Sequence, residues 1–254
     1  MIPAELKKIN DQVDLIVIDL LEITPQLADI IDKHIIEICE GASDSELKLV
    51  KNRFLKFLDP KDKRTQHGAV SEFFVHLYLK MQNYKQEFLF FNLEEGSIKK
   101  GFDGYFSKDN EEFIVESKSG SAISNNISHQ NKINEAYDDI KSVVAGKSKK
   151  SKNNPWRNAY NHASHIDTQT KLSIRKKIKE LSNLFDEGKF KNIEEFNIIP
   201  CSTIFLDGKL GESFSDSILN EKEKYFIKFK SKTSKILCTT KNSYDTFYKY
   251  LQEA

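Results

Sequence analysis

Residues 101–120, GFDGYFSKDNEEFIVESKSG, decide the fold that the sequence predicts. Two stretches rich in aromatic and apolar residues, 102–106 and 113–115, flank a polar centre, which is typical of two strands joined by a tight turn. A two-residue turn at Asp109 and Asn110 would close a β-hairpin. Since Asp-Asn is not the strongest hairpin turn, a register shifted by one residue stays open.

This register brings charged residues together on one face of the hairpin. It places Asp103 opposite Glu116. It also pairs Phe106 with Phe113, a favourable cross-strand contact. Residues two apart in a strand point the same way, so Lys118 shares the face of Glu116. The hairpin is apolar on both sides, which predicts a central strand pair, and buried acids there need a chemical reason. The alternative is an ordinary surface cluster of ion pairs.

The acid-x-Lys motif at Glu116 is weak evidence for a site by itself, because the same motif recurs elsewhere in this charge-rich chain. The other copies begin at Glu5, Glu46, Asp59, Asp139, Glu187 and Asp207. Only the copy at Glu116 ends a strongly apolar strand, residues 113–115, so we select it as the candidate site.

Two neighbouring carboxylates repel each other and favour the binding of a hard divalent cation. Mg²⁺, or Mn²⁺ in its place, takes oxygen ligands and keeps waters, one of which can attack a phosphate. We therefore predict that Asp103 and Glu116 are metal ligands and catalytic residues, with the Ser117 carbonyl as a third ligand. Lys118 is predicted to be catalytic, because an ammonium group can activate the water and stabilise charge on the phosphate.

The same residues resemble the PD-(D/E)xK nuclease superfamily, which has an acid on one strand and (D/E)xK on the next, after a helix that carries a Glu. Here these are Asp103, Glu116-x-Lys118 and Glu72, and Phe102 stands in place of the Pro. The resemblance covers roughly residues 65–207. It implies an α/β fold with an αβββαβ core, a mixed central sheet flanked by helices, and metal-dependent hydrolysis of phosphodiester bonds. It also implies that Glu72 lies near the metal; the alternative is a Glu on the helix surface.

A narrower resemblance is to the HamA family, the nuclease component of the bacterial Hachiman anti-phage system. It rests on TQHGAVSEFFVHLYL, KKGFDG, IVESKSG and NIIPCSTIFLD, in that order along the chain. The resemblance implies DNA as the target and a helicase subunit, HamB, as a partner.

The remaining pattern predicts two parts: an acidic N-terminal helical region, residues 1–63, and a nuclease-like domain, residues 64–254, with a basic insertion around 146–190. We expect helices throughout about the first 58 residues, including one after Thr24-Pro25 and one capped by Ser43 or Asp44. Further helices are expected at 65–83, 127–145, 158–187 and 243–252. Strands are expected at 86–91, 99–107, 111–118 and 197–206, with one or two more at 225–239. Pro200 should mark an irregularity or an edge strand.

Basic residues around 147–157 predict contact with nucleic acid, since Trp156 and Tyr160 beside them suit unstacked bases. The predicted contacts are Lys147, Lys149, Lys150, Lys152 and Arg157, and Gln130 as an amide that binds phosphate. The alternatives are a solvated loop and a solvated helix residue.

Composition, net charge and cysteine count bear on the possible partners and the cellular compartment. The net charge of +1 says nothing about a partner, and three distant Cys argue for a reducing compartment. No signal peptide or transmembrane segment is expected, so we predict a cytoplasmic protein. The rival function is a non-catalytic module that binds nucleic acid or a helicase. The sequence leaves the oligomeric state open.

Overall fold

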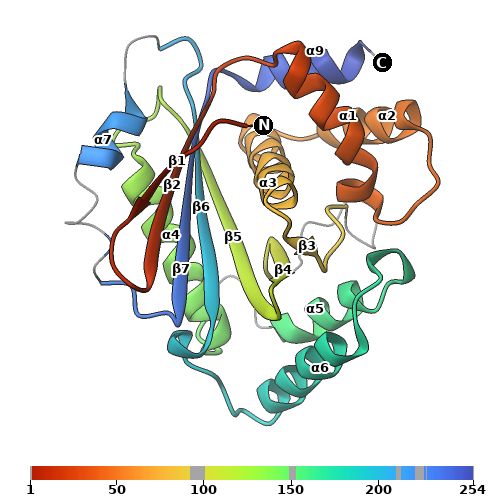
Figure 1. The fold of residues 1–254 in the computed structure, drawn as a ribbon, viewed down its shortest axis with the longest axis vertical. Helices are drawn as coiled ribbons and strands as arrows, with labels where there is room; N and C mark the ends of the chain where they lie inside the picture. The colour runs from red at the N-terminus through yellow and green to blue at the C-terminus, as the bar shows by residue number, and fades with distance from the viewer. Residues whose placement is uncertain are drawn as a thin grey trace.

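The computed structural model describes residues 2–91, 101–148, 153–209, 213–220, 226 and 228–253. It is an α/β fold in which helices flank a seven-stranded mixed sheet of order β1-β2-β7-β6-β5-β4-β3 (Figure 1). This confirms the expected α/β class with a mixed central sheet. Residues 63–205 follow the order helix, three strands, helix and strand, with extra helices before the last strand.

The strands are β1 (Glu5–Lys8), β2 (Val13–Leu20), β3 (Lys85–Gln86), β4 (Gly104–Lys108), β5 (Glu111–Ser121), β6 (Asn197–Phe205) and β7 (Thr233–Lys241). Neighbours are parallel from β2 through β7 and β6 to β5. The outer strands β1, β4 and β3 are antiparallel to their neighbours. The parallel centre is covered on both sides, as its apolar strands require.

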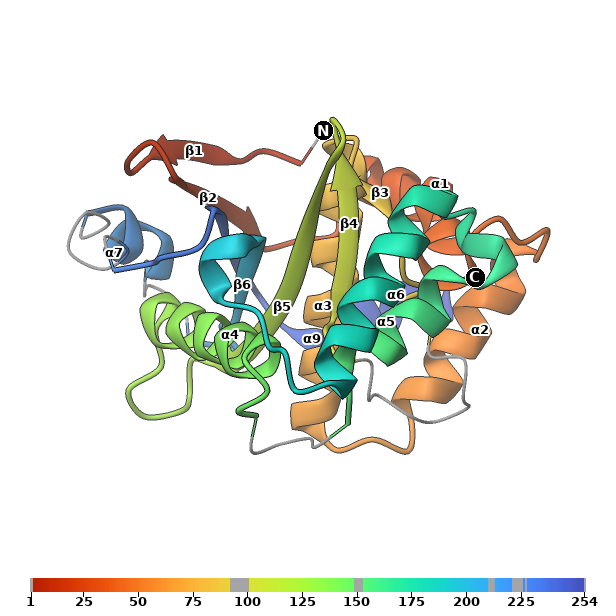
Figure 2. The same ribbon diagram turned by 90° about the horizontal axis from the view of Figure 1, so that it is seen from below.

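Helices cover the two faces of the sheet in separate groups. One face carries α1 (Pro25–Glu40), α2 (Leu47–Leu58), α3 (Lys63–Met81) and α9 (Tyr244–Gln252). The other hydrophobic core contains α4 (His129–Val144), α5 (Pro155–Ala163), α6 (Leu172–Asp186) and α7 (Phe214–Asn220), with short 3₁₀ turns η1 (Ile166–Thr168) and η2 (Ile193–Glu195). Figure 2 shows α3 and α4 on opposite sides of β5. None of the helices that the structure describes combines the length and apolarity needed to cross a bilayer.

The helix expected near the N-terminus is wrong. Residues 13–20 form β2, which pairs in parallel with β7 in the interior of the sheet. Its side chains enter both cores, with Leu15 in one and Ile18 in the other. A strand buried on both faces is apolar almost throughout, so its period does not distinguish it from a buried helix. The N-terminal strands therefore belong to the same sheet as the rest of the chain, and α1 and α2 share a core with α3.

The helix after Thr24-Pro25 is confirmed as α1. Thr24 Oγ1 accepts a hydrogen bond from the Leu27 N–H, and Pro25 occupies the first turn. The predicted cap of α2 is wrong, because Glu46 precedes that helix without a side-chain hydrogen bond. Ser43 instead lies within hydrogen-bond distance of Glu40 and Ser45.

The hairpin has the predicted register. Lys108 pairs with Glu111 and Phe106 with Phe113. Asp109 and Asn110 have φ angles of 51° and 64°, the left-handed conformation that a two-residue turn of type I′ needs.

Other predictions about the strands are only partly confirmed. Within 86–91 only Gln86 belongs to a strand, because the chain then turns so that the Phe90 N–H bonds to the Ile38 carbonyl at the end of α1. Among the described residues of 225–239 there is one strand, β7, which begins at Thr233. Pro200 lies in central β6 and not at an edge. The β6–β7 register skips Ile199 and Pro200, so the predicted irregularity is confirmed.

The turn gives a first prediction. Asn110→Val should lower the free energy of unfolding by about 1–2 kcal/mol, because a β-branched residue is strained at positive φ. Asn110→Gly should leave stability unchanged or raise it, since Gly adopts this conformation freely. Urea unfolding followed by circular dichroism measures both, and equal midpoints for the two variants would contradict the turn.

Candidate functional site

Two charged side chains of β5 meet a third from α4. Lys118 Nζ contacts Glu116 Oε1, as their shared face predicts, and lies 2.9 Å from Asp139 Oδ2. The side chains of Glu116, Lys118 and Asp139 are only 12%, 16% and 20% exposed. Lys118 is therefore held between two carboxylates at a mostly buried position. We call Asp103, Glu116, Lys118 and Asp139 the carboxylate cluster.

Asp103 joins the cluster through the backbone of β5. Its Oδ2 accepts a hydrogen bond of 2.7 Å from the Ser117 N–H, directly beside Glu116. Asp103 lies one residue before β4 begins. Beyond the end of that strand, its carboxylate takes the place of a backbone acceptor for the Ser117 N–H. The register thus brings the two predicted ligands side by side.

The residues before Asp103 fix its position. Phe102 is buried against Trp156, with ring centroids 5.0 Å apart. Gly101 has φ 86°, and a Cβ there would lie 2.9 Å from Pro155 Cα. Only Gly permits this approach at this backbone angle, so α5 determines where the chain enters β4.

The electrostatics of the cluster favour a cation. Burial raises the pKa of Glu116, and the neighbouring Asp103 raises it further; together they outweigh Lys118 and bring this pKa to about 8. Burial disfavours the Lys118 ammonium, but Glu116 and Asp103 outweigh burial and raise the pKa of Lys118 above its usual value. The protein thus holds more negative charge here than one ammonium group offsets.

Ser117 and Glu72 lie toward the helix on the other face. Ser117 Oγ is 2.8 Å from Ser71 Oγ of α3. Glu72 follows Ser71, and its carboxylate lies 3.8 Å from His76 Nε2. A Cβ on Gly104 would lie 3.4 Å from the same His76 nitrogen, so His76 and its neighbour Glu72 lie near the start of β4. A role for Glu72 at the metal stays a prediction.

The donor set fits a magnesium-type ion. The described part of the chain has no group of three or more His, Cys, Asp or Glu side chains placed to hold a metal. Mg²⁺ needs fewer, because it is commonly bound through one or two carboxylates with waters and phosphate oxygens completing the shell. Asp103 and Glu116 supply these two carboxylates, and a cation between them would offset their repulsion.

Asp139 was missed by the sequence reasoning, although it begins one of the discarded acid-x-Lys copies. Its only signal is its place on α4, between the core residues Ala136 and Ile140. That spacing puts Asp139 at the margin of the buried face of α4. Which strand α4 crosses depends on tertiary packing and is not visible in the sequence.

The three predicted nucleic-acid residues that the structure describes lie on different segments of the chain. Arg157 pairs with Asp186 of α6, and Gln130 Nε2 donates to Asn134 Oδ1 at 3.0 Å. Lys147 is exposed just after α4. Lys149, Lys150 and Lys152 lie outside the described residues. Trp156 is 1% exposed, so the expectation that it stacks on bases is wrong: it packs within the protein, against Phe102 and Phe196.

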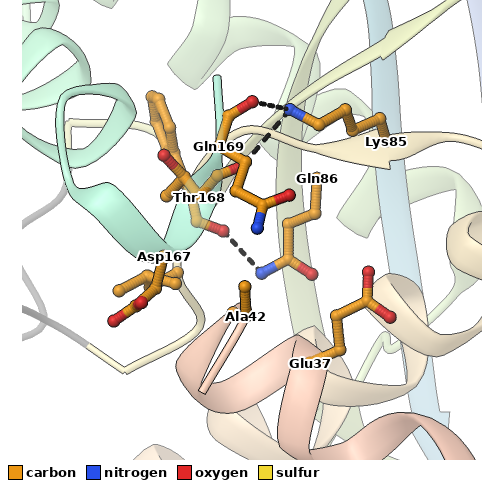
Figure 3. A pocket seen from close by; sticks show the side chains of 10 residues that line it. Glu37, Ala42, Lys85, Gln86, Asp167, Thr168 and Gln169 are labelled. Atoms are coloured by element: carbon orange, nitrogen blue, oxygen red, sulfur yellow. Dashed lines mark hydrogen bonds between the residues drawn. The ribbon is translucent and has the colours of Figure 1, made fainter. Parts of the chain in front are cut away.

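A small cavity of about 100 Å³ lies elsewhere, where the end of α1 meets β3 and η1 (Figure 3). Lys85 Nζ there donates to the carbonyls of Thr168 and Gln169, at 3.2 and 2.9 Å. Its lining residues include no member of the carboxylate cluster. The cavity is therefore separate from the carboxylate cluster.

The buried Glu116 gives a second prediction. Its pKa is raised in the folded state above the ordinary 4.5, so its contribution to stability is full below about pH 4.5 and is lost as pH rises toward 8. In EDTA, Glu116→Gln should remove this loss and become more stable than the native protein as pH rises. The difference should grow by roughly 1 kcal/mol per pH unit between about pH 5 and 8.

Thermal unfolding at several pH values measures this difference. Glu111→Gln is the matched control, because Glu111 lies on the same strand but is exposed and paired with Lys232. Parallel stability curves for the native protein and Glu116→Gln would show that Glu116 is not buried as described.

Compared with models of known protein families and with curated proteins, the sequence gives no match.

Proposed function

We propose that this protein is a metal-dependent nuclease that hydrolyses DNA phosphodiester bonds at the carboxylate cluster, with Mg²⁺ or Mn²⁺ as its cofactor. One observation carries the proposal: two carboxylates and an ammonium group, Asp103, Glu116 and Lys118, converge at a mostly buried place in the sheet. Burying these charged groups lowers the stability of the fold, and such groups are gathered most often at functional sites.

The residues divide the chemistry among themselves. Asp103 and Glu116 would hold the ion, with the Ser117 carbonyl next to them. A bound divalent ion supplies Lewis-acid polarisation of the phosphate and lowers the pKa of a coordinated water. Lys118 would orient the attacking water and stabilise the negative charge that grows on the phosphate. The hydrogen bond from Ser117 to Asp103 keeps that carboxylate in place during the reaction.

Nucleic acid is the substrate that the surface and the sequence pattern support. The exposed side of α6 carries Lys176, Lys177 and Lys179, with Lys171 just before it, and such basic residues bind phosphate backbones. The resemblance to PD-(D/E)xK nucleases supports hydrolysis. The resemblance to HamA supports DNA as the target, a HamB-like helicase partner and a cytoplasmic role in anti-phage defence.

A plasmid assay tests the proposal. The purified protein should nick or degrade plasmid DNA with Mg²⁺ or Mn²⁺ and be inactive in EDTA. Glu116→Gln and Lys118→Ala should each lower the rate on the order of 100-fold or more, because each removes charge that acts in the transition state. Glu111→Gln on the same strand should cleave at the native rate.

Two results would count against the proposal. Full activity of both Glu116→Gln and Lys118→Ala would place the chemistry elsewhere. The non-catalytic binding module would be favoured by a protein that binds DNA but cleaves it with none of the metals. This binding would weaken with salt and would not change when the carboxylates of the cluster are substituted.

A further inference from the structure

We propose that Asp139 is a positioning residue, which keeps the Lys118 ammonium beside the site when Glu116 is taken up by a divalent cation. The inference rests on the proposed function, and it assigns a task to the one member of the carboxylate cluster that the reaction does not otherwise use.

Lys118 has two carboxylate partners, and a bound cation would weaken its contact with one of them. Its Nζ contacts Glu116 Oε1 on one side and lies 2.9 Å from Asp139 Oδ2 on another. A carboxylate that coordinates a divalent ion has less charge to share with an ammonium group. Because the Lys side chain is a long, flexible stem, Lys118 needs a second partner to stay in position. Asp139 is that partner.

Asp139 lies on a helix whose place does not depend on this ion pair. The buried side of α4 packs into the core through Ile133, Ala136, Tyr137, Ile140 and Val144. At the start of the helix, His129 Nδ1 is 2.9 Å from Ser202 Oγ, and its Nε2 is 3.2 Å from Thr240 Oγ1. In the middle of the helix, two residues before Asp139, the Tyr137 hydroxyl accepts from the Lys230 N–H. Asp139 thus stands on a helix that core packing holds on both sides of it and that side-chain hydrogen bonds hold on its N-terminal side.

The two carboxylates therefore have different tasks. Glu116 lies on the same strand as Lys118 and beside Asp103, where an ion would be shared. Asp139 reaches the ammonium group from a separate element, across the space between α4 and β5. Removing the charge of Asp139 should leave the two metal ligands in place and release Lys118.

The experiment compares Asp139→Asn with Asp138→Asn, its exposed neighbour on the same helix, and with Asp139→Glu, which keeps the charge. Three quantities are measured: the rate of plasmid cleavage at saturating Mn²⁺, Mn²⁺ binding by calorimetry, and acylation of Lys118 by an amine-reactive reagent, quantified by mass spectrometry. Thermal unfolding confirms that every variant is folded.

We expect Asp139→Asn to lower the maximal rate about 10- to 100-fold, the usual loss when the partner of a site residue is removed. Its KM for DNA and its Mn²⁺ affinity should stay within about threefold of the native values, since the metal ligands keep their places. Acylation of Lys118 in the Mn²⁺-bound protein should rise several-fold. Asp138→Asn should match the native protein, and Asp139→Glu should recover part of the rate.

Three outcomes would overturn the inference: native cleavage by Asp139→Asn, unchanged acylation of Lys118 in that variant with Mn²⁺, or loss of Mn²⁺ binding, which would make Asp139 a ligand. The two proposals fail separately. If the native protein binds Mn²⁺ without cutting DNA, while Asp139→Asn still exposes Lys118 to acylation, the nuclease proposal fails and the positioning of Lys118 stands.

Discussion

The hydrogen bond from the Ser117 N–H to Asp103 Oδ2 is the contact on which the candidate site depends. It fastens an acid from the entrance of β4 to the middle of β5, next to Glu116. The two carboxyl groups would otherwise separate whenever both are ionised, because repulsion between buried carboxylates is strong. The packing of Phe102 on Trp156 and the close approach of Gly101 to Pro155 hold the chain for this bond. Helix α5 thereby supports the site without contributing a predicted ligand to it.

The site also shows how a parallel strand serves two faces. Alternation along β5 directs Glu116 and Lys118 toward α4, while Ser117 between them reaches Ser71 of α3. Helix α3 holds the strand through Ser71 on one face, and α4 contributes Asp139 to the carboxylate cluster on the other. The cost of gathering these charges in the interior is a stability that falls as pH rises, since Glu116 resists ionisation.

Local patterns predicted what is local. The hairpin register, the α1 cap at Thr24 and the irregularity at Pro200 follow from turn chemistry and from the missing proline N–H, and the structure confirms all three. The sequence could not distinguish strand from helix at residues 13–20, because a strand buried on both sides has no polar face. Asp139 and the burial of Trp156 depend on how α4 and α5 pack, which no short pattern encodes.

The position of β2 has a consequence for biosynthesis. Its first residue, Val13, pairs with Ser234, so an early-made strand finds its neighbour only when a late segment has left the ribosome. Pairing between such distant segments carries a large loop-closure cost and slows folding. Until β7 emerges, β2 presents an unpaired apolar edge, for which chaperones are the usual protection against aggregation. The central sheet, on which the carboxylates are displayed, is accordingly completed only after translation of β7.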